Sequence, residues 1–281
     1  MPELPEVESI RLQLEKFIIG HTIEELEVRH PKYEIKEKDK IVGRRFIGVR
    51  RFGKALVMDL DNDYSLVAHV KMTGQFIYQG PNLKATPIYT KKVVGGVPGK
   101  HTHMIFHLDR GGILYFNDYR RFGWVKLVKS EELINDSFVG RLGPEFLKDM
   151  TQSKFSETLS GSKKPIKVLL MDQEKMAGAG NIYANDALWL AGINPKHPAS
   201  SLKTNAKKTL FKAIENVLRE GIKRGGASEL AFVTPDGGEG EYQNFTLVYG
   251  REGKPCKKCG KLIKKIKLGG RGTYFCPNCQ K

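Results

Sequence analysis

Apolar residues near the start of the chain recur at the spacing of an α-helix. They form one stripe between residues 4 and 18, as expected for a helix with one buried face. The stripe consists of Val7, Ile10, Leu14, Phe17 and Ile18. Pro5 suits the first turn, acidic side chains complement the amino end, and Gly20 ends the pattern. The sequence therefore predicts an amphipathic helix over residues 4–18.

The pattern becomes that of short strands between about residues 22 and 128. Runs rich in Val, Ile and aromatic residues alternate with Gly, Asp and Asn, which is typical of β-structure. The runs are 22–30, 44–52, 54–62, 65–73, 74–79, 103–109, 112–118 and 123–129. This number of strands predicts a β-sandwich. The stretch 80–102 carries several Gly and Pro residues and is predicted to be a long loop.

Beyond about residue 130 the spacing returns to that of helices. Residues 163–176, 181–192 and 201–224 are predicted to be helical. One side of the last helix carries Leu210, Phe211, Ile214, Val217, Leu218 and Ile222. Residues 224–241 contain several Gly and predict an irregular, mobile loop.

The overall charge is strongly basic. The 281 residues include 47 Lys and Arg against 31 Asp and Glu, which gives a formal charge of +16 and a pI near 9.6. Nucleic acid is the commonest acidic partner of such a protein, and general colloidal charge is the alternative. A hydrophobic fraction of 40% predicts a packed core. No apolar run approaches the ~18 residues of a membrane span, and the acidic start does not resemble a signal peptide, so we expect a cytoplasmic protein with no membrane partner.

The four cysteines lie together near the end of the chain, as Cys256-x2-Cys259 and Cys276-x2-Cys279. This spacing predicts one structural Zn²⁺, because each pair supplies two thiolates from one turn and a hairpin brings the pairs together. Disulfides are the alternative, which a reducing compartment disfavours. The hairpin is expected over residues 261–275. Residues 254–281 also contain eight Lys, Arg271 and no acidic residue, so this ribbon is expected to contact phosphates without selecting a sequence.

These patterns predict an α+β fold with three parts. Residues 1–130 form an amino-terminal helix and a β-sandwich, residues 131–241 a helical domain that includes the irregular loop, and residues 242–281 a zinc ribbon. Within the helical domain, the Gly-rich turn 177–181 precedes a helix. Amides at that helix start, the Asn181 side chain and nearby Lys167 could hold a phosphate, and plain packing of two helices is the alternative.

Pro2 is a candidate nucleophile at the amino terminus. A small second residue normally allows removal of Met1, which leaves a secondary amine at the start of the chain. An α-amino group has a pKa of about 7.7–8.0 against about 10.4 for Lys, so a far larger fraction is neutral near pH 7. Such an amine attacks an aldehyde-like carbon to form an iminium, and Glu3 and Glu6 could serve as acid and base. The alternative is an ordinary helix start.

Seven motifs, spread over nearly the whole chain, resemble the formamidopyrimidine-DNA glycosylase family, bacterial enzymes that remove oxidised purines such as 8-oxoguanine. The motifs are MPELPEVE, FGKALVMDL, HVKMTG, DYRRFG, GAGNIYANDALWLAGINP, VYGREGKPC and RGTYFCPNCQ. The start PELPEVE, rather than PEGPE, favours this family over the related endonuclease VIII branch, which prefers oxidised pyrimidines. The resemblance implies a helix-two-turn-helix in the helical domain and a monomeric enzyme of base excision repair that binds damaged double-stranded DNA and associates with the nucleoid.

The resemblance also implies a role for each candidate residue. Pro2 would attack C1′ of the damaged nucleotide, and β- and δ-elimination would then cut the strand, which makes the enzyme both a glycosylase and an AP lyase. Glu3 would assist sugar-ring opening and Glu6 would support the same pocket. Lys54 is expected to grip a phosphate and to belong to the catalytic set with Pro2, Glu3 and Glu6. Asn181, Tyr249 and Arg271 are expected to grip phosphates as well. Met72, Arg120 and Phe122 would fill the hole left by the everted base. Lys167 and His69 complete the expected set of DNA-binding residues.

Each assignment has a simpler alternative. Met72 and Phe122 could be core residues, Arg120 could be solvated, and Lys54 could be an edge charge that prevents aggregation. His69 could be a buried structural residue, as could His103, and Glu8 a helix-end charge. The protein as a whole could be a non-catalytic zinc ribbon that binds nucleic acid. Four features depart from the family pattern. Tyr119 replaces the usual Pro, IYANDAL replaces the usual acidic pair after IYA, and the loop 80–102 is long. The segment 227–241, which in that family covers the everted base, diverges most.

Overall fold

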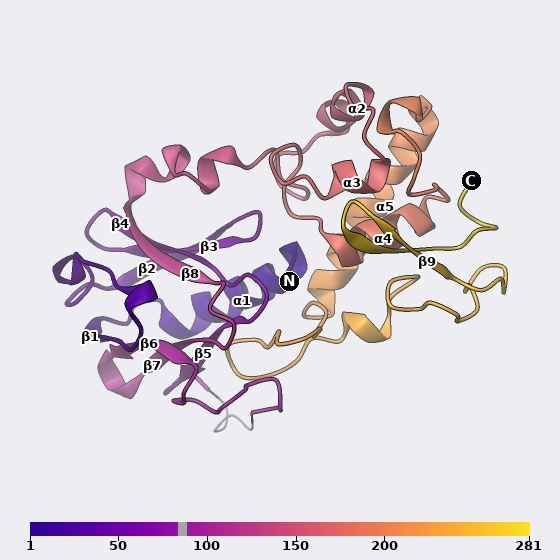
Figure 1. The fold of residues 1–281 in the computed structure, drawn as a ribbon. Coiled ribbons are helices and arrows are strands. Elements are labelled where there is room, and N and C mark those ends of the chain that lie inside the picture. Colours follow the sequence, from indigo (N-terminus) through magenta and orange to yellow (C-terminus); the bar gives the residue numbers. More distant parts are fainter. Residues whose placement is uncertain (84–88) are drawn as a thin grey trace. The chain divides into compact units, whose positions relative to one another are not determined.

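The computed structural model describes residues 1–83 and 89–281. These residues form two compact units. The first unit consists of Met1–Arg141 with Arg224–Gln243, and the second of Leu142–Lys223 with Asn244–Lys281 (Figure 1). Within the described residues, no helix has the length and apolar character needed to span a membrane.

All eight predicted strands are present in the first unit. They are β1 (Ile23–Val28), β2 (Phe46–Phe52), β3 (Ala55–Leu60), β4 (Tyr64–His69), β5 (Gly74–Gln79), β6 (Thr102–Leu108), β7 (Ile113–Asp118) and β8 (Trp124–Lys129). They form two antiparallel four-stranded sheets, in the orders β1-β6-β7-β5 and β2-β3-β4-β8. The predicted β-sandwich is confirmed.

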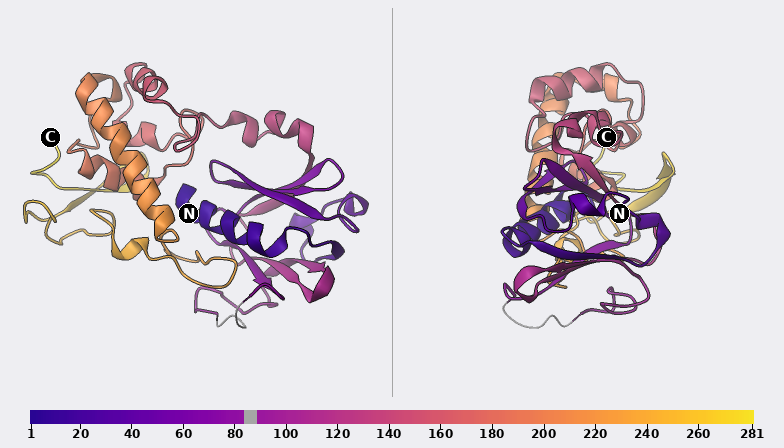
Figure 2. Two further views of the ribbon diagram at one scale, coloured as in Figure 1. Left: turned by 180° about the vertical axis from the view of Figure 1, so that it is seen from behind. Right: turned by 90° about the vertical axis from the view of Figure 1, so that its left-hand side faces the viewer.

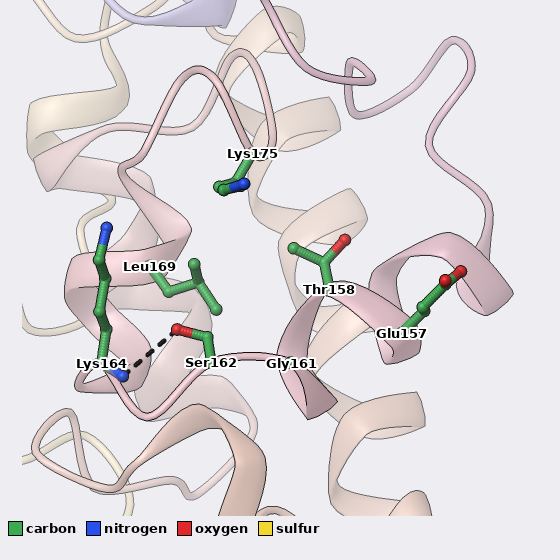
Figure 3. A pocket seen from close by; sticks show the side chains of 7 residues that line it. All are labelled: Glu157, Thr158, Gly161, Ser162, Lys164, Leu169 and Lys175. Atoms are coloured by element: carbon green, nitrogen blue, oxygen red, sulfur yellow. Dashed lines mark hydrogen bonds between the residues drawn. The ribbon is translucent and has the colours of Figure 1, made fainter.

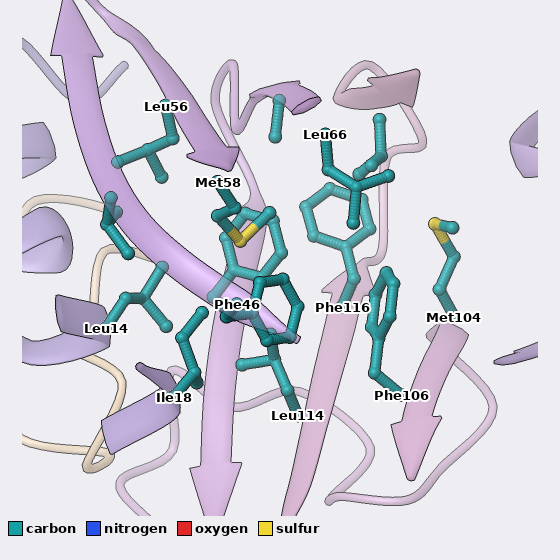
Figure 4. Packing of buried hydrophobic residues seen from close by; sticks show 14 of the residues in the cluster. Leu14, Ile18, Phe46, Leu56, Met58, Leu66, Met104, Phe106, Leu114 and Phe116 are labelled. Carbon is teal, nitrogen blue, oxygen red and sulfur yellow. The ribbon is translucent and has the colours of Figure 1, made fainter. Parts of the chain in front are cut away.

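The helix α1 (Leu4–Ile18) has the predicted bounds and supplies one wall of the core. Its stripe joins residues of both sheets in a single buried cluster. In Figure 4, Leu14 and Ile18 point towards Phe46 and the other side chains between the sheets. Burying a Leu or Phe side chain stabilises a fold by about 1.5–3 kcal/mol, so this stripe fixes the helix, and with it the amino terminus, against the sandwich.

The segment 224–243 belongs to the first unit, whereas the sequence predicts a mobile loop of the helical domain. Phe232 and Val233 are 3% and 1% exposed. Phe232 joins the central core, and Val233 packs with Ile77 in a second apolar cluster. The segment is irregular, as predicted, but it lies with the sandwich because two of its apolar residues are buried there. Its mobility stays a prediction. The predicted long loop 80–102 forms turns over 80–83 and 89–101, and its residues 84–88 lie outside the described residues.

The second unit holds the remaining helices and a hairpin (Figures 1 and 2). They are α2 (Gln152–Ser160), α3 (Ile166–Leu170), α4 (Asn181–Leu190), α5 (Thr204–Lys223, orange in Figure 2), β9 (Lys264–Leu268) and β10 (Arg271–Phe275). The predictions for α4, α5 and the hairpin are confirmed. The helix expected over 163–176 is shorter, since the chain turns at Asp172, whose backbone oxygen accepts hydrogen bonds from the amides of Lys175 and Met176.

Two kinds of element were not expected from the apolar pattern. The helix α2 buries only Phe155 and Leu159, and the hydroxyl of Thr151 caps its amino end. Short 3₁₀ turns complete the chain: η1 (Pro31–Tyr33), η2 (Lys38–Lys40), η3 (Asp109–Gly111), η4 (Ser130–Asn135), η5 (Val139–Arg141), η6 (Ala199–Ser201) and η7 (Tyr242–Asn244).

Candidate nucleic-acid interface and active site

The amino terminus is held by the carboxylate of Glu6. Pro2 is buried and Met1 is 43% exposed, while Glu3 and Glu6 are 3% and 1% exposed. One oxygen of Glu6, Oε2, accepts a hydrogen bond from the Glu3 amide at 2.7 Å, and Oε1 accepts one from the Ala227 amide, also at 2.7 Å. Glu6 therefore links the start of α1 to the segment 224–243 and positions the residues next to Pro2.

Gly226 lets this segment approach Glu6 closely. It has a φ of +83°, and a Cβ atom at this position would lie 2.8 Å from Cγ and 2.9 Å from Oε1 of Glu6. Only glycine adopts this conformation without strain and leaves room for the carboxylate. The sequence singled out Glu6 as part of the pocket, but its link to residues 226 and 227 could not be found from the local pattern.

Lys54 lies in the two-residue turn between β2 and β3, and only 3% of it is exposed. The alternative of an exposed edge charge is therefore wrong. Arg51 supports this turn, because its guanidinium donates to the Gly53 carbonyl at 2.9 Å and to Glu8 at 2.7 Å. Burial alone would raise the pKa of Glu8, but Arg51 and Arg11 lower it below its ordinary value. Glu8, expected to be a simple helix-end charge, thus orients the arginine that braces the turn.

His69 is a buried residue rather than an exposed contact. It is 3% exposed, and its ring lies against Trp124 and Phe138, with centroids 5.9 and 5.0 Å away. Its Nδ1 accepts a hydrogen bond from the Lys71 amide at 2.9 Å. Burial, followed by the positive charges of Lys71 and Lys54, lowers the pKa of His69 to about 3. The structural alternative fits His69 better than the predicted DNA contact.

The acid side of the stability profile is expected to depend on His69. An unfolded chain protonates this ring near pH 6.5 and the folded chain only near pH 3. The contribution of the neutral His69 ring to the free energy of unfolding is therefore fully present above pH 6.5. It is lost as the pH falls towards 3, by at most ~1.4 kcal/mol per pH unit. Urea unfolding of the wild type and of His69→Phe, measured between pH 7 and 4, should show a shallower decline in the variant. Parallel declines would contradict the assignment.

Met72, Arg120 and Phe122 lie together in the first unit, at its solvent-exposed surface. The Arg120 Nη1 is 3.4 Å from the Met72 sulfur, and the guanidinium lies 4.6 Å from the centre of the Phe122 ring. Phe122 is 51% exposed and Arg120 is exposed. The core alternative is therefore wrong for Phe122. An exposed aromatic ring with an arginine stacked on it is suited to insertion between bases.

Asp118 fixes the loop that carries this cluster. Its fully buried carboxylate accepts hydrogen bonds from the Thr73 hydroxyl and, at 2.6 Å, from the Gly123 amide. Its backbone oxygen accepts from Arg121 at 3.1 Å and contacts Nε2 of His103 at 2.9 Å. His103 is 5% exposed, which confirms its structural alternative. The ends of the loop are thus held at both sides of residue 119, where this chain has Tyr.

In the second unit, Lys167 has a different role from the one predicted. It is fully buried, and its Nζ donates to Asn181 Oδ1 at 2.6 Å, to Thr273 Oγ1 at 2.8 Å and to the Gly272 carbonyl at 3.1 Å. A lysine ammonium has three donors, and these contacts use all three. The prediction that Lys167 contacts DNA is therefore wrong. Lys167 joins α3 to α4 and to β10, and it orients Asn181 by holding the amide oxygen, which leaves the NH₂ end as the donor.

Asn185 and Asp186, the departure noted in the motif IYANDAL, tie α4 to two neighbouring segments. Asn185 Oδ1 accepts a hydrogen bond from the Tyr274 amide at 2.8 Å. Asp186, which is fully buried, accepts from the amides of Leu247, Val248 and Tyr249 at 2.9, 2.9 and 3.0 Å. The Tyr249 ring packs edge-on against Tyr274, with centroids 5.2 Å apart. Asp186 thus sets the place of Tyr249, a role that the sequence did not indicate.

Removal of the Asp186 carboxylate is expected to destabilise the second unit. Asp186→Ala leaves three buried amides without their acceptor, and hydrogen bonds to charged groups contribute about 1.5–3 kcal/mol each, so a loss of at least ~3 kcal/mol is expected. Urea unfolding measures this loss. Asp39→Ala, which removes a carboxylate that is 70% exposed, is the matched control and should change stability by less than ~0.5 kcal/mol. Equal effects of the two substitutions would contradict the role of Asp186.

The four cysteines converge as the spacing predicts. Their sulfur atoms all lie within 4.8 Å of one another, with Cys259 and Cys276 at 3.5 Å and Cys256 and Cys279 at 3.9 Å. Tetrahedral Zn²⁺ with Zn–S bonds of about 2.3 Å needs sulfurs about 3.8 Å apart, whereas a disulfide needs about 2.05 Å. Although burial alone would raise it, N–H donors including Trp189 Nε1 at 3.3 Å lower the pKa of Cys256 to about 6. The residues fit one structural Zn²⁺ with no open position.

The hairpin beside the cysteines is basic on its exposed surface. Gly269 and Gly270 both have positive φ, +56° and +75°, as the tight turn between β9 and β10 requires. Arg271 follows the turn and is exposed, as are Lys264, Lys265 and Lys267. The hairpin is therefore suited to contacts with phosphates, which depend on charge and not on base identity.

A separate cavity of about 520 Å³ opens in the second unit near α2 and α3 (Figure 3). Its lining residues are Glu157, Thr158, Gly161, Ser162, Lys164, Leu169 and Lys175. The amide of Lys164 donates to the Ser162 hydroxyl at 3.3 Å, and its ammonium pairs with Asp172 at 3.0 Å. No predicted site residue lines this cavity.

A β-sandwich, a helical domain and a four-cysteine ribbon on one chain define the class of helix-two-turn-helix DNA glycosylases. Three family models match in this order: the formamidopyrimidine-DNA glycosylase N-terminal domain over residues 1–125, the H2TH domain of the same enzyme over 142–232, and the zinc finger found in FPG and IleRS over 253–281. The chain belongs to the formamidopyrimidine-DNA glycosylase family, the DNA glycosylases with AP lyase activity of base excision repair.

Individual relatives agree over the full length. The formamidopyrimidine-DNA glycosylase of Heliobacterium modesticaldum is 41% identical, with 100% of both chains covered. The crystal structure of MutM (Fpg) from Thermus thermophilus has a TM-score of 0.86 at 37% identity, covering 99% of this chain and 98% of that one. The Lactococcus lactis Fpg in complex with DNA containing N7-benzyl-Fapy-dG also has a TM-score of 0.86, at 34% identity and with 100% of both chains covered.

Proposed function

We propose that this glycosylase excises oxidised purines, 8-oxoguanine and formamidopyrimidines, through a Schiff base at Pro2 followed by β,δ-elimination. The observation that carries the proposal is the exposed contact of Met72, Arg120 and Phe122. A half-exposed Phe beneath an Arg adds little to the core of the sandwich. Insertion of these side chains into a duplex offsets the few kcal/mol needed to evert a base, with Arg120 facing the orphaned partner.

The chemistry begins with the amine of Pro2 after removal of Met1. The neutral amine attacks C1′ of the everted nucleotide, the glycosidic bond breaks, and the base leaves with its electron pair and takes up a proton. Ring opening of the sugar, assisted by Glu3, gives an iminium between the Pro2 nitrogen and C1′. This iminium acts as an electron sink: a C2′ proton passes to a base of the site as the 3′ phosphate leaves, and the C4′ proton of the resulting conjugated iminium is then lost as the 5′ phosphate leaves. Water hydrolyses the remaining adduct and restores the amine.

The other residues of the site hold the DNA or the site itself. Lys54, Asn181, Tyr249 and Arg271 grip the phosphates beside the lesion in this proposal. Lys54 lies in the turn that Arg51 supports. Asn181 presents its NH₂ group because Lys167 donates a hydrogen bond to its side-chain oxygen. Glu6 acts as a positioning residue, since both of its oxygens accept backbone hydrogen bonds. The enzyme acts as a monomer in the cytoplasm, bound to the nucleoid through its DNA substrate.

Borohydride trapping tests the proposal directly. The protein is incubated with a duplex that contains 8-oxoguanine opposite C, and peptide mapping locates the reduced adduct. An adduct at Pro2 is expected, with strand cleavage on both sides of the sugar. Binding without an adduct would identify a non-catalytic DNA-binding protein. Faster excision of thymine glycol than of 8-oxoguanine would overturn the assigned lesion class and favour oxidised pyrimidines.

A further inference from the structure

Lys92 joins two loops of the first unit that are far apart in the sequence. It lies in the loop 89–101, and its Nζ donates to the Ser228 carbonyl at 2.6 Å and pairs with the carboxylate of Glu239. Both contacts are made to the segment 224–243. The side chains of Lys92 and Glu239 are 26% and 32% exposed, so the pair is partly shielded from water and is screened less than a surface pair.

A second, buried link supports the same contact. The side-chain amide nitrogen of Gln75, Nε2, on β5, donates to the Lys92 carbonyl at 2.9 Å and to the Ala231 carbonyl at 2.6 Å. Gln75 is 2% exposed, so its two donors hold both loops from beneath. Val93 and Val233 extend the link, since both are buried in one apolar cluster. The loop 89–101 and the segment 224–243 are therefore joined by hydrogen bonds and an ion pair, and by apolar packing of Val93 and Val233 in one cluster.

The ammonium of Lys92 and the carboxylate of Glu239 carry opposite charges at this link. Burial alone would raise the pKa of Glu239, but hydrogen bonds from Lys92 and Thr90 hold it below its ordinary value. The carboxylate is therefore ionised at neutral pH and attracts the ammonium. Ser228 takes part at a second point, because its hydroxyl accepts a hydrogen bond from the Gly240 amide at 2.7 Å. Lys92 thus contacts the segment at two positions, residues 228 and 239. The Ser228–Gly240 hydrogen bond shows that these two parts of the segment lie next to each other.

Between these points most residues are buried, but Glu229 and Leu230 are exposed to solvent. Leu230 is 57% exposed and has a φ of +52°, a conformation that non-glycine residues adopt at a cost. Its neighbours are fixed, because Ala227 is hydrogen-bonded to Glu6 beside Pro2 and Ala231 to Gln75. Leu230 is thus an exposed apolar residue between two fixed points, and one of them, Ala227, is hydrogen-bonded to the carboxylate of Glu6 near Pro2.

We propose that Lys92 is a positioning residue for base excision, which holds the segment 226–240 in the conformation that covers the everted base. This inference rests on the proposed function. It assigns a specificity role to the loop 89–101, which the family motifs do not include. A lesion that still carries its base needs the covering segment, whereas a preformed abasic site offers no base to cover. Lys92 should therefore affect base excision and not the subsequent elimination.

The experiment compares two reactions of the full-length protein under single-turnover conditions. One is excision of 8-oxoguanine opposite C, and the other is cleavage of the same duplex with a preformed abasic site. Because hydrogen bonds to a charged group are among the stronger ones, Lys92→Met is expected to lower the rate of excision about tenfold. Cleavage at the abasic site should stay within about twofold of wild type. Lys91→Met, which removes the exposed neighbouring charge, is the matched control and should change neither rate.

Two further variants identify the contacts. Glu239→Gln should lower excision less than Lys92→Met, since the bond to the Ser228 carbonyl remains. Lys92→Arg should restore most of the excision, because a guanidinium can reach both acceptors. Hydrogen exchange of the amides in 226–240 should accelerate in Lys92→Met, which shows that the segment has loosened.

The outcomes separate the two proposals. Excision by Lys92→Met at the wild-type rate, or an equal fall in excision and abasic-site cleavage, overturns the positioning role alone. A wild-type protein that cleaves abasic sites but excises no 8-oxoguanine overturns the proposed lesion class, and this inference with it. Selective loss of excision in Lys92→Met, but not in Lys91→Met, supports both.

Discussion

Pro2→Gly is expected to lower cleavage of 8-oxoguanine duplexes by roughly a hundredfold or more, with duplex affinity within about twofold of wild type. Pro2 brings a secondary amine, whose iminium carries its positive charge at every pH. A glycine amine forms an imine that must first be protonated, and it lacks the buried ring that fixes the direction of the nitrogen. The DNA-gripping residues are unchanged in this variant, so binding should persist.

The measurement is single-turnover cleavage combined with borohydride trapping, on protein whose intact mass shows that Met1 has been removed. Acetylation of the processed amino terminus gives an independent control, because it blocks the nitrogen and leaves the side chains unchanged. Both the variant and the acetylated protein should lose the trapped adduct. Cleavage at the wild-type rate in either would remove Pro2 from the mechanism.

Cys276→Ser is expected to lose zinc and DNA affinity together. Cys276 is fully buried, and its sulfur lies 3.5 Å from that of Cys259. Zinc binding by such a ribbon is coupled to its folding, so removal of one thiolate should release the metal and disorder the hairpin that carries Arg271. A fall in affinity of at least about tenfold is expected from the loss of several phosphate contacts.

Metal content and duplex affinity are measured on the same preparation at one salt concentration. Treatment of the wild type with a chelator should reproduce the effect of the variant, and added Zn²⁺ should restore affinity to the wild type only. Loss of zinc with undiminished affinity would show that the ribbon does not organise DNA binding.

The regular elements were predictable because their burial follows the sequence pattern. The strands and α1 have clear periods of apolar residues, and the cysteine spacing leaves few ways to arrange four sulfurs. The helix α2 was missed because only Phe155 and Leu159 mark its buried face. The packing of the segment 224–243 on the sandwich is not visible in the sequence, because the apolar run 230–233 is too short to show a period and is flanked by Gly and polar residues.

The candidate site was predictable in its residues and less so in their roles. The sequence predicts that basic side chains near the site contact phosphates, yet Lys167 is fully buried with three acceptors within the protein. Charge alone does not distinguish a residue that meets a ligand from one that holds another residue in place. Asp186 was missed for the same reason, since its amide partners at 247–249 lie more than 60 positions away.

Arg120 contacts both Met72 and Phe122 within the protein itself. Long side chains normally lose up to ~2 kcal/mol of rotamer freedom each when they are immobilised. Here part of that entropy is already lost within the protein, because the guanidinium rests on the ring and the sulfur. Pre-organisation of this kind lowers the penalty of association on every duplex alike, so this contact favours eversion of a base but does not itself select a lesion.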